Sequence, residues 1–398
     1  MAMPGLEQLN LSQRRVLLRA DLDVPLDADG SVQDDTLLRA ALPTLRLIRE
    51  RRAKVILMTH LGAPNGQKDA ATSVIPVAER LAELLDDEII VPDDCIGDGV
   101  RSLHVGLRDG QIMLLENLRW HRGEETANDS FARELAALGA VYVNEAFGLL
   151  HRPDASIARV PRLLDERGLG LLARKELDGL GKLLGGYRVP FVAVLGGACT
   201  DARLAAARAL VARANVLVLG GALALPFLAA QGRGTGRTPV AAAHLAQARD
   251  VLRLARDRKV TLLLPVDHVV ATEVAEGASL DVVPADAVPA DRHVVDVGPA
   301  TVRAFAEAVA RARTVYWSGP VGVHEHPSMR AGSSAVAHAV AQVNGYSVVS
   351  GGETLVAVTE SGVTPFISHL SSGGAAALAF VAGLELPGLA ALSSREDR

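Results

Sequence analysis

The sequence predicts an α/β protein in two halves, each with a parallel sheet covered by helices on both faces. Its 398 residues exceed the length of one typical domain, so more than one domain is expected. Short apolar runs alternate with amphipathic stretches along nearly the whole chain, which indicates repeated β-α units. The apolar runs are continuous rather than alternating, and this is typical of parallel strands buried on both faces.

In the first half, apolar runs predict strands, and stretches with apolar residues at helical spacing, such as TLLRAALPTLRLIRERR, predict helices. The expected strands are RVLLRADLDV (15–24), KVILMTHLG (54–62), QIMLLENLR (111–119) and AVYVNEAF (140–147), and the expected helices cover 36–52, 73–85 and 128–139.

The rhythm restarts after residue 189. An amphipathic stretch edged by glycines, 162–186, is expected to be a helix that connects the halves. The second half predicts a helix at 201–214 and strands at 190–197, 215–221, 260–271, 314–319, 346–352 and 364–374.

Composition excludes several classes of protein. Apolar residues make up 49% and charged residues 22%, so a mainly disordered chain is excluded. The formal net charge of −5 argues against nucleic acid or an anionic membrane as the main partner. Two cysteines cannot form a disulfide framework, and neither a signal-peptide core nor an apolar run of 18 residues is present. A cytoplasmic protein without a membrane span is therefore expected.

Glycine-rich turns follow the expected strands of the second half. Glycine allows a backbone to approach an anion closely, and the N-terminus of a following helix offers free N–H groups and a partial positive charge. These turns favour a nucleotide or phosphate ligand, although α/β sheets also need small residues at tight turns. The turns are LGGACTD (195–201), LGGALA (219–224), SGPVG (318–322), SGGET (350–354) and SSGGAAA (371–377).

Charged and histidine side chains follow the expected strands of the first half. Arginines in such positions can clamp a phosphate or carboxylate, although each alone is also explained by a surface ion pair. His121 and His151 have no third ligand at metal-binding spacing, so no metal cage is expected. The set comprises Asp21, Asp23, Arg39, His60, Arg119, His121, His151 and Arg152.

Taken in order, the motifs resemble those of the phosphoglycerate kinase family from about Arg15 to Leu392. In the first half the matching segments are RADLDVP (19–25), DDTLLRAALPTL (34–45), THLGAP (59–64), LLENLRWHRGEE (114–125) and YVNEAFGLLHRPDAS (142–156). In the second half they are LGGACTDAR (195–203), LLLPVDHVVA (262–271), DVGPAT (296–301), WSGPVGVHE (317–325), SGGET (350–354) and HLSSGGAAA (369–377).

The resemblance implies two Rossmann-like domains that close about a helical hinge, and a glycolytic, monomeric kinase that uses ATP with Mg²⁺. An N-terminal domain, 1–165 with 385–398 returning to it, would bind 3-phosphoglycerate. Residues 166–186 would form the hinge helix, and a C-terminal domain, 187–384, would bind ADP or ATP.

The resemblance also implies site residues. Asp21, Asp23, His60, Arg119 and Arg152 match positions that bind the acid, and the matching catalytic positions are Arg39, Arg203, Gly373 and Gly374. Nucleotide positions are matched by Gly196, Gly197, Cys199, Gly220, Gly221, Glu325, Gly351, Gly352, Glu353 and Thr354, with Glu353 also in contact with the nucleotide's Mg²⁺.

Several positions depart from the family pattern. The acid site has Leu37 and Ala63 in place of arginines, Asp23 in place of asparagine and Asp154 in place of histidine. These four changes alter the formal charge by about −4, which weakens the attraction for a trianionic acid.

In the nucleotide site the departures are Cys199 and Arg203 in place of lysines, Ser318 in place of asparagine, and Ser350 and Glu353 in place of glycine and aspartate. Losing one cation beside transferred phosphates costs roughly 10²–10⁵ in rate, which Arg203 would partly offset. Cys199 is either an activated thiol or an inert filler of the lysine's space, and the filler is favoured because no base is visible beside it.

Three functions stay open from the sequence. The chain is an active phosphoglycerate kinase of reduced rate, an inactive paralogue that binds a nucleotide or another ligand, or a phosphotransferase for a different, less anionic acid. The family reaction is our working expectation.

Overall fold

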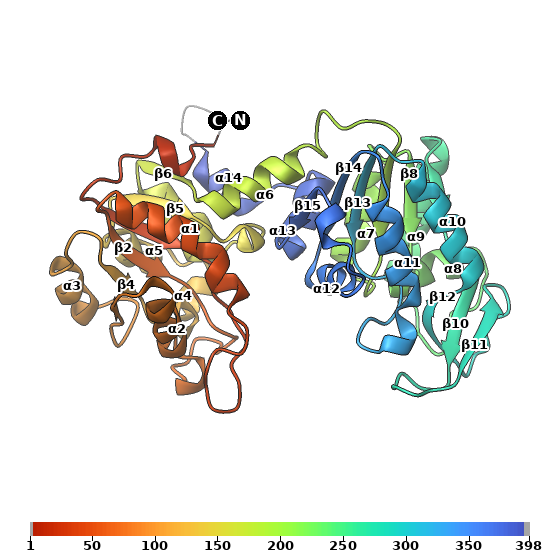
Figure 1. The fold of residues 1–398 in the computed structure, drawn as a ribbon, viewed down its shortest axis with the longest axis horizontal. Helices are drawn as coiled ribbons and strands as arrows, with labels where there is room; N and C mark the ends of the chain where they lie inside the picture. The colour runs from red at the N-terminus through yellow and green to blue at the C-terminus, as the bar shows by residue number, and fades with distance from the viewer. Residues whose placement is uncertain (1–2, 394–398) are drawn as a thin grey trace. The chain divides into compact units, whose positions relative to one another are not determined.

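The computed structural model describes residues 3–393, which form two compact units (Figure 1). Unit 1 contains the described residues up to Leu177 and from Glu385 onward, and unit 2 contains Asp178–Leu384. The boundary therefore falls inside helix α6 (Leu171–Gly181). Of the C-terminal segment 385–398, residues 394–398 lie outside the described residues.

Unit 1 is built on a parallel six-stranded sheet in the order β3-β4-β2-β1-β5-β6. The strands are β1 (Arg15–Arg19), β2 (Lys54–Met58), β3 (Ile89–Ile90), β4 (Ile112–Leu114), β5 (Val141–Asn144) and β6 (Glu166–Leu169). The helices are α1 (Thr36–Glu50), α2 (Ile75–Leu85), α3 (Asp98–Val105), α4 (Arg122–Glu125), α5 (Asp129–Ala136) and α14 (Pro387–Leu392).

Helix α1 shows how the pattern buries one face. Its apolar residues recur every three or four positions, and Leu38, Leu45 and Ile48 are fully buried. They pack in the unit 1 core with β1 and β2 residues such as Leu18 and Leu57. The C-terminal helix α14 also belongs to this unit, where Gly388 N–H donates to the Leu150 carbonyl at 3.0 Å.

Unit 2 has a second parallel six-stranded sheet, in the order β15-β14-β13-β7-β8-β9, and a three-stranded antiparallel sheet, β11-β10-β12. The strands are β7 (Phe191–Leu195), β8 (Val216–Leu219), β9 (Thr261–Leu263), β10 (Asp267–Ala271), β11 (Leu280–Pro284), β12 (His293–Val297), β13 (Thr314–Ser318), β14 (Tyr346–Ser350) and β15 (His369–Ser371). The helices are α7 (Asp201–Leu210), α8 (Leu225–Ala230), α9 (Ala242–Asp257), α10 (Pro299–Ala310), α11 (Ala331–Ala341), α12 (Gly352–Glu360) and α13 (Gly374–Ala382).

The predicted α/β class with parallel sheets is confirmed, but several element predictions were wrong. The expected strand 260–271 is two strands, β9 and β10, that belong to different sheets because Pro265 interrupts the run. Within 364–374 only β15 is a strand, preceded by a 3₁₀ turn at Thr364–Phe366. The small antiparallel sheet was not predicted.

The expected helix over 162–186 is also shorter than predicted. Residues Glu166–Leu169 form β6, paired in parallel with β5, and only Leu171–Gly181 is α-helical. Pro4 approaches this strand closely: its carbonyl oxygen accepts from Leu169 N–H at 2.9 Å and would lie 2.6 Å from a Cβ at Gly168. The N-terminal segment therefore lies against a backbone position that only glycine leaves open.

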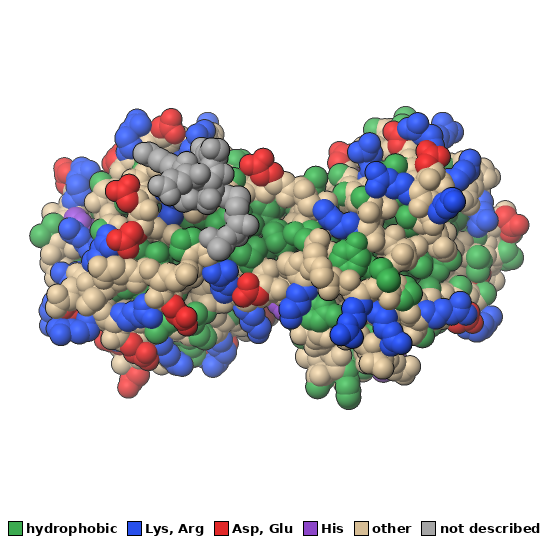
Figure 2. All heavy atoms as spheres, turned by 90° about the horizontal axis from the view of Figure 1, so that it is seen from above, with side chains coloured by type: hydrophobic (Ala, Val, Ile, Leu, Met, Phe, Trp, Pro, Cys, Tyr) green, Lys and Arg blue, Asp and Glu red, His purple; other side chains and the backbone are tan. Residues whose placement is uncertain are grey.

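Surface charge agrees with the composition. Figure 2 shows Lys and Arg side chains interspersed with Asp and Glu on the face that it presents. No helix among the described residues has the length and apolarity needed to cross a membrane.

Candidate active site

The unit 1 site begins with a buried arginine at the end of β1. Arg19 is 1% exposed, and its Nη2–H donates to His60 Nδ1 at 3.0 Å. Arginine has no acceptor, so Nδ1 accepts and the His60 proton is on Nε2, which lies 3.4 Å from Asp23 Oδ2. Burial, partly opposed by Asp23, lowers the pKa of His60, so the ring is neutral near pH 7.

Asp23 is held in place from two sides. Its Oδ1 accepts a hydrogen bond from the Gly62 N–H at 2.8 Å. Burial raises the pKa of Asp23, but the hydrogen bonds from His60 and Gly62 outweigh burial, and the net pKa is lowered. The carboxylate is therefore ionised and adds a negative charge beside His60.

Arg119 follows β4 in a 3₁₀ turn, Leu118–Trp120, that Asn117 caps through its side chain. The guanidinium is almost buried, and its Nη1 donates to the Gly62 carbonyl at 2.8 Å. Its buried Nε has no hydrogen-bond partner in the described part of the chain, since Glu125 Oε1 is 3.8 Å away. Arg119 thus keeps an unused donor, which a ligand oxygen can satisfy.

Arg152 is next to Arg119, and its charge is already compensated. Its Nε donates to Asp154 Oδ2 at 2.8 Å, and its Nη2 lies 3.3 Å from Glu125 Oε1. Asp154 is 1% exposed, so this pair is screened little by solvent. Arg119 Nε and Arg152 Nη2 lie 3.8 and 3.3 Å from the same oxygen, Glu125 Oε1, so the two guanidinium groups are close together. Burial, and after it the charge of Arg152, lowers the pKa of Arg119.

The sequence-predicted acid-site residues are thus only partly brought together. His60, Asp23, Arg119 and Arg152 form one connected cluster, as the ion pairs and hydrogen bonds above describe. Arg39 is on α1, is half exposed, and donates instead to Asp35 at 2.7 Å. Asp21 is half-buried shortly after β1, and no hydrogen bond links it to this cluster among the described side chains.

In unit 2, a pocket of about 200 Å³ lies at the carboxyl ends of the strands. Of the predicted nucleotide residues, Gly197, Gly221, Glu325 and Glu353 line it. The other lining residues are Ala198, Ala222, Leu225, Pro265, His268, Val294, Val295, Asp296, Val297, Pro320, Val321, Gly322, Val323 and His324. Most of these residues are Gly, Ala, Pro or Val, which suits the largely apolar wall of a small-molecule pocket.

Three glycines are required where the turns after β7, β8 and β13 meet. A Cβ at Gly196 would overlap the Pro320 carbonyl oxygen, and Gly197 N–H donates to that oxygen at 2.6 Å. Gly197 has a positive φ of +74°, which disfavours a larger residue. Gly220 meets the same turn, because a Cβ there would lie 2.6 Å from Val321.

Arg203 extends from α7 to this turn. Its Nη1 donates to the Ser318 carbonyl at 3.2 Å, and a Cβ at Gly319 would lie 2.6 Å from that nitrogen. Burial lowers the pKa of Arg203, opposed by Tyr316 and Glu353, yet an arginine stays charged at neutral pH. The positive charge of Arg203 therefore lies beside the glycine-rich turn at Gly197.

Two helices begin at the same strand ends. Gly351, with φ +96°, precedes α12, and Thr354 in its first turn accepts from Gly319 N–H at 2.7 Å. Gly352 and Glu353 are exposed at that turn, so the Glu353 carboxylate is free to meet a hard cation such as Mg²⁺. Gly373 and Gly374 begin α13, and a Cβ at Gly374 would meet nothing within 4 Å.

Cys199 does have a base beside it, so the expectation of no neighbouring base was wrong. His244 of α9 places Nδ1 3.4 Å from Sγ, and its Nε2 is 3.5 Å from Asp201 Oδ1. Burial first, and then Asp201, raise the pKa of Cys199, which keeps the sulfur protonated at neutral pH. The thiol therefore donates toward His244 rather than acting as a free thiolate.

Comparison with known proteins places this geometry in a family. Residues 6–384 match the family model described as phosphoglycerate kinase. The phosphoglycerate kinase of Anaeromyxobacter dehalogenans (strain 2CP-C) is 44% identical over 393 residues, covering 98% of this chain and 99% of that protein. That of Moorella thermoacetica is 42% identical, covering 99% and 100%.

The solved structure of phosphoglycerate kinase from Coxiella burnetii superposes with a TM-score of 0.86 at 34% identity, covering 98% of this chain and 99% of that one. The chain belongs to the phosphoglycerate kinase family. It is therefore a kinase, as the sequence analysis expected, and its two parallel sheets are those of phosphoglycerate kinases.

The sequence analysis did not single out two residues that line the unit 2 pocket, Asp296 and His268. Asp296 is 3% exposed and accepts from Gly332 N–H and Val297 N–H, each at 2.8 Å. Burial, opposed by those donors, raises its pKa to about 7. His268 is 2% exposed, and neither ring nitrogen has a partner among the described residues. The signal was present in the motifs DVGPAT and LLLPVDHVVA, but nothing in them marked these side chains as buried.

Because of His268, the free energy of unfolding is expected to fall at acid pH. Burial lowers its pKa to about 4 from about 6.5 when unfolded, so the unfolded state takes up the proton first as pH falls. Stability is complete above pH 6.5 and decreases toward pH 4, by up to about 3 kcal/mol from this group. In His268→Gln, urea unfolding at pH 6.5 and 4.5 is expected to show a smaller loss than in the unsubstituted protein.

The matched control is His338→Gln, which changes an exposed histidine on α11. Its loss of unfolding free energy between the two pH values is expected to equal that of the unsubstituted protein. An unchanged loss in His268→Gln would show that His268 is not the titrating group.

Proposed function

We propose that this protein transfers a phosphoryl group between ATP and the carboxylate of 3-phosphoglycerate, forming ADP and 1,3-bisphosphoglycerate. The observation that carries the proposal is that each unit holds groups suited to bind an anion, in a chain that matches the family over nearly its full length. Unit 1 holds clustered guanidinium groups with the unused Arg119 Nε donor, and unit 2 holds a glycine-lined pocket next to Arg203. All of these come from one chain, so a monomer is sufficient.

In unit 1, Arg119 and Arg152 would bind the phosphate and carboxylate oxygens of the acid. Neutral His60 has one N–H, on Nε2, which now faces Asp23, so this N–H would have to turn from Asp23 to donate to an oxygen of the acid. Asp21 would bind a hydroxyl of the acid. Arg39 would have to leave Asp35 to face the transferred group, which its exposed position allows.

In unit 2, the pocket would hold the nucleoside, with Gly221 and Glu325, which line the pocket, and the adjacent Gly220 around the base and ribose. The backbone at Gly196 and Gly197, together with Arg203, would hold the phosphates. Cys199 would lie next to them in place of the family's lysine. The turn Gly351–Thr354 begins a helix whose free N–H groups favour anions.

Glu353 would hold the Mg²⁺ that accompanies the nucleotide. That ion supplies charge neutralisation between neighbouring phosphate oxygens. The fit rests on an exposed carboxylate that lines the pocket beside Glu325, since oxygen donors suit a hard cation.

For the transfer, the chain's own groups need to position the two substrates and stabilise the charge of the transferred phosphoryl group, and they need not form covalent bonds. The guanidinium of Arg39 and the N–H groups of Gly373 and Gly374 would stabilise charge on the moving phosphoryl group. We further propose that the rate is lower than in relatives that keep the family's lysine at position 199, because one cation is missing there.

The test is a coupled assay in which 1,3-bisphosphoglycerate made from ATP and 3-phosphoglycerate is reduced with NADH. Turnover that needs both substrates and is below that of the Anaeromyxobacter dehalogenans enzyme is expected. Equal turnover would contradict the reduced rate. No turnover, with MgADP binding retained in calorimetry, would favour the inactive binding protein, and turnover with a less anionic acid alone would favour the third function.

Asp154 gives a prediction on substrate affinity. Asp154→Asn keeps the shape and one acceptor for Arg152 but removes a buried negative charge from the acid site. The KM for 3-phosphoglycerate is expected to fall by about threefold to tenfold, because part of a ~4 kcal/mol charge interaction is relieved and the rest is screened. Steady-state kinetics at fixed ATP measures this.

Asp109→Asn is the matched control, since Asp109 pairs with the exposed Arg52 instead. Its KM is expected to be unchanged. A rise of KM in Asp154→Asn would mean that the carboxylate orients Arg152 more than it repels the acid.

A further inference from the structure

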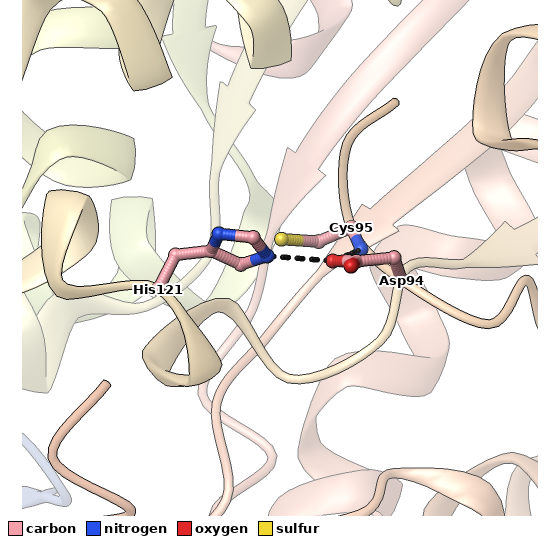
Figure 3. Close-up of side chains that lie close together, drawn as sticks. All are labelled: Asp94, Cys95 and His121. Atoms are coloured by element: carbon pink, nitrogen blue, oxygen red, sulfur yellow. Dashed lines mark hydrogen bonds and ion pairs between the residues drawn. The ribbon is translucent and has the colours of Figure 1, made fainter. Parts of the chain in front are cut away.

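A second cluster of chemically active side chains lies in unit 1. Asp94 and Cys95 follow β3, and His121 follows the 3₁₀ turn that carries Arg119. Figure 3 shows the three side chains pointing toward one another, with a hydrogen bond between His121 and Asp94. One carboxylate oxygen, the thiol sulfur and a ring nitrogen all lie within 4.8 Å of one another.

This combination of donors suits one class of ligand. Thiolate, imidazole and carboxylate are the ligands of Zn²⁺ and similar borderline to soft divalent cations. Bonds of about 2.0–2.3 Å in tetrahedral geometry place the donors roughly 3.3–3.8 Å apart. His121 Nε2 and Asp94 Oδ1 are now 2.6 Å apart, so they would separate slightly while the sulfur approaches.

We propose that Asp94, Cys95 and His121 form a three-ligand site for Zn²⁺ or a chemically similar divalent cation, with water in the fourth position. The sequence analysis expected no third ligand for His121. The structure places two further ligands, Asp94 and Cys95, beside His121. The loop after β3 and the turn after β4 converge, although 27 residues separate Asp94 from His121 in sequence.

Binding requires a defined movement of protons. The Cys95 sulfur binds as the thiolate and releases its proton to solvent. His121 Nε2 now donates to Asp94 Oδ1, so its proton moves to Nδ1 and the Nε2 lone pair takes the cation. Asp94 binds through Oδ1, the oxygen that already faces His121.

Charged groups of both signs lie around the cluster. Lys68 Nζ contacts the other oxygen of Asp94, Oδ2, at 2.6 Å, and can stay there while Oδ1 binds the cation. The cluster therefore offers a cation two carboxylate oxygens, of which Lys68 occupies only one.

Access and support also fit a site. Cys95 is buried, but the side chains of Asp94 and His121 are 24% and 27% exposed, which leaves an approach from solvent. The His121 ring stacks on Phe131, with centroids 5.4 Å apart, which fixes its plane. Because His121 is two residues after Arg119, a bound cation would fasten the segment that carries Arg119.

Cobalt provides the direct test. The protein is expected to take up one equivalent of Co²⁺ with a sulfur-to-cobalt charge-transfer band in the near ultraviolet and visible bands of tetrahedral intensity. Cys95→Ser is expected to abolish the charge-transfer band. The matched control Cys199→Ser, at the only other cysteine, is expected to retain it.

Zinc gives an independent measurement. Added ZnCl₂ is expected to raise the melting temperature and to displace cobalt, and His121→Gln and Asp94→Asn are each expected to weaken binding by at least about a hundredfold. Both side chains are partly exposed, so these variants test the site even if Cys95→Ser folds poorly.

Absence of the sulfur band would overturn the proposal. So would a band lost in Cys199→Ser and kept in Cys95→Ser, since the cation would then lie on Cys199 and His244. None of these readouts depends on turnover of phosphoglycerate.

Discussion

Arg119→Ala is expected to lower kcat/KM for 3-phosphoglycerate by about 10³-fold or more. The guanidinium is 8% exposed, is fixed by its bond to the Gly62 carbonyl, and keeps Nε free of any hydrogen bond within the described structure. Donors fixed in this way and desolvated cost roughly 10²–10⁵ in rate when removed from phosphoryl-transfer and related sites. Steady-state kinetics with both substrates varied measures the effect.

Two variants separate charge from geometry. Arg119→Lys keeps the charge but loses the planar fork, so it is expected to recover only part of the activity. Arg52→Ala removes an exposed arginine of the same unit, paired with Asp109, and is expected to leave kcat/KM unchanged. A loss below tenfold in Arg119→Ala, with the fold intact by circular dichroism, would remove Arg119 from the acid site.

Local pattern was sufficient to predict the strands that carry the site. β1, β2, β7 and β13 lie inside the expected runs because each has an apolar centre and ends at a charged or glycine-rich turn. The clustering of His60, Arg119 and Arg152 could be expected for the same reason, since strand ends of a parallel sheet share one edge.

Contacts between distant segments were beyond the sequence. Cys199, just before α7, and His244, on α9, are 45 residues apart, and no spacing rule joins them. The compensation of Arg152 by Asp154 was equally hidden, because an Arg-x-Asp pair on the surface would be solvated, whereas here the carboxylate is buried. Burial, which depends on packing, decided the chemistry in both cases.

Arg19→Met is expected to destabilise unit 1 by about 3–5 kcal/mol, because it leaves the buried carboxylate of Glu124 without its opposing charge. Ser156 links the two, since its Oγ accepts from Arg19 Nε at 2.8 Å and donates to Glu124 Oε1 at 2.5 Å. Glu124 is 0% exposed, so solvent cannot replace the lost cation. Urea unfolding at pH 7 measures the loss.

The double variant Arg19→Met/Glu124→Gln removes both charges and is expected to regain part of that free energy, since a neutral amide is less costly to bury than a carboxylate. Loss of the Arg19 side chain also removes the donor that sets the His60 tautomer. Arg19→Met is therefore expected to raise the KM for 3-phosphoglycerate even where the protein remains folded. A loss below about 1 kcal/mol in Arg19→Met, or no recovery in the double variant, would show that Ser156 and the surrounding backbone alone stabilise the Glu124 carboxylate.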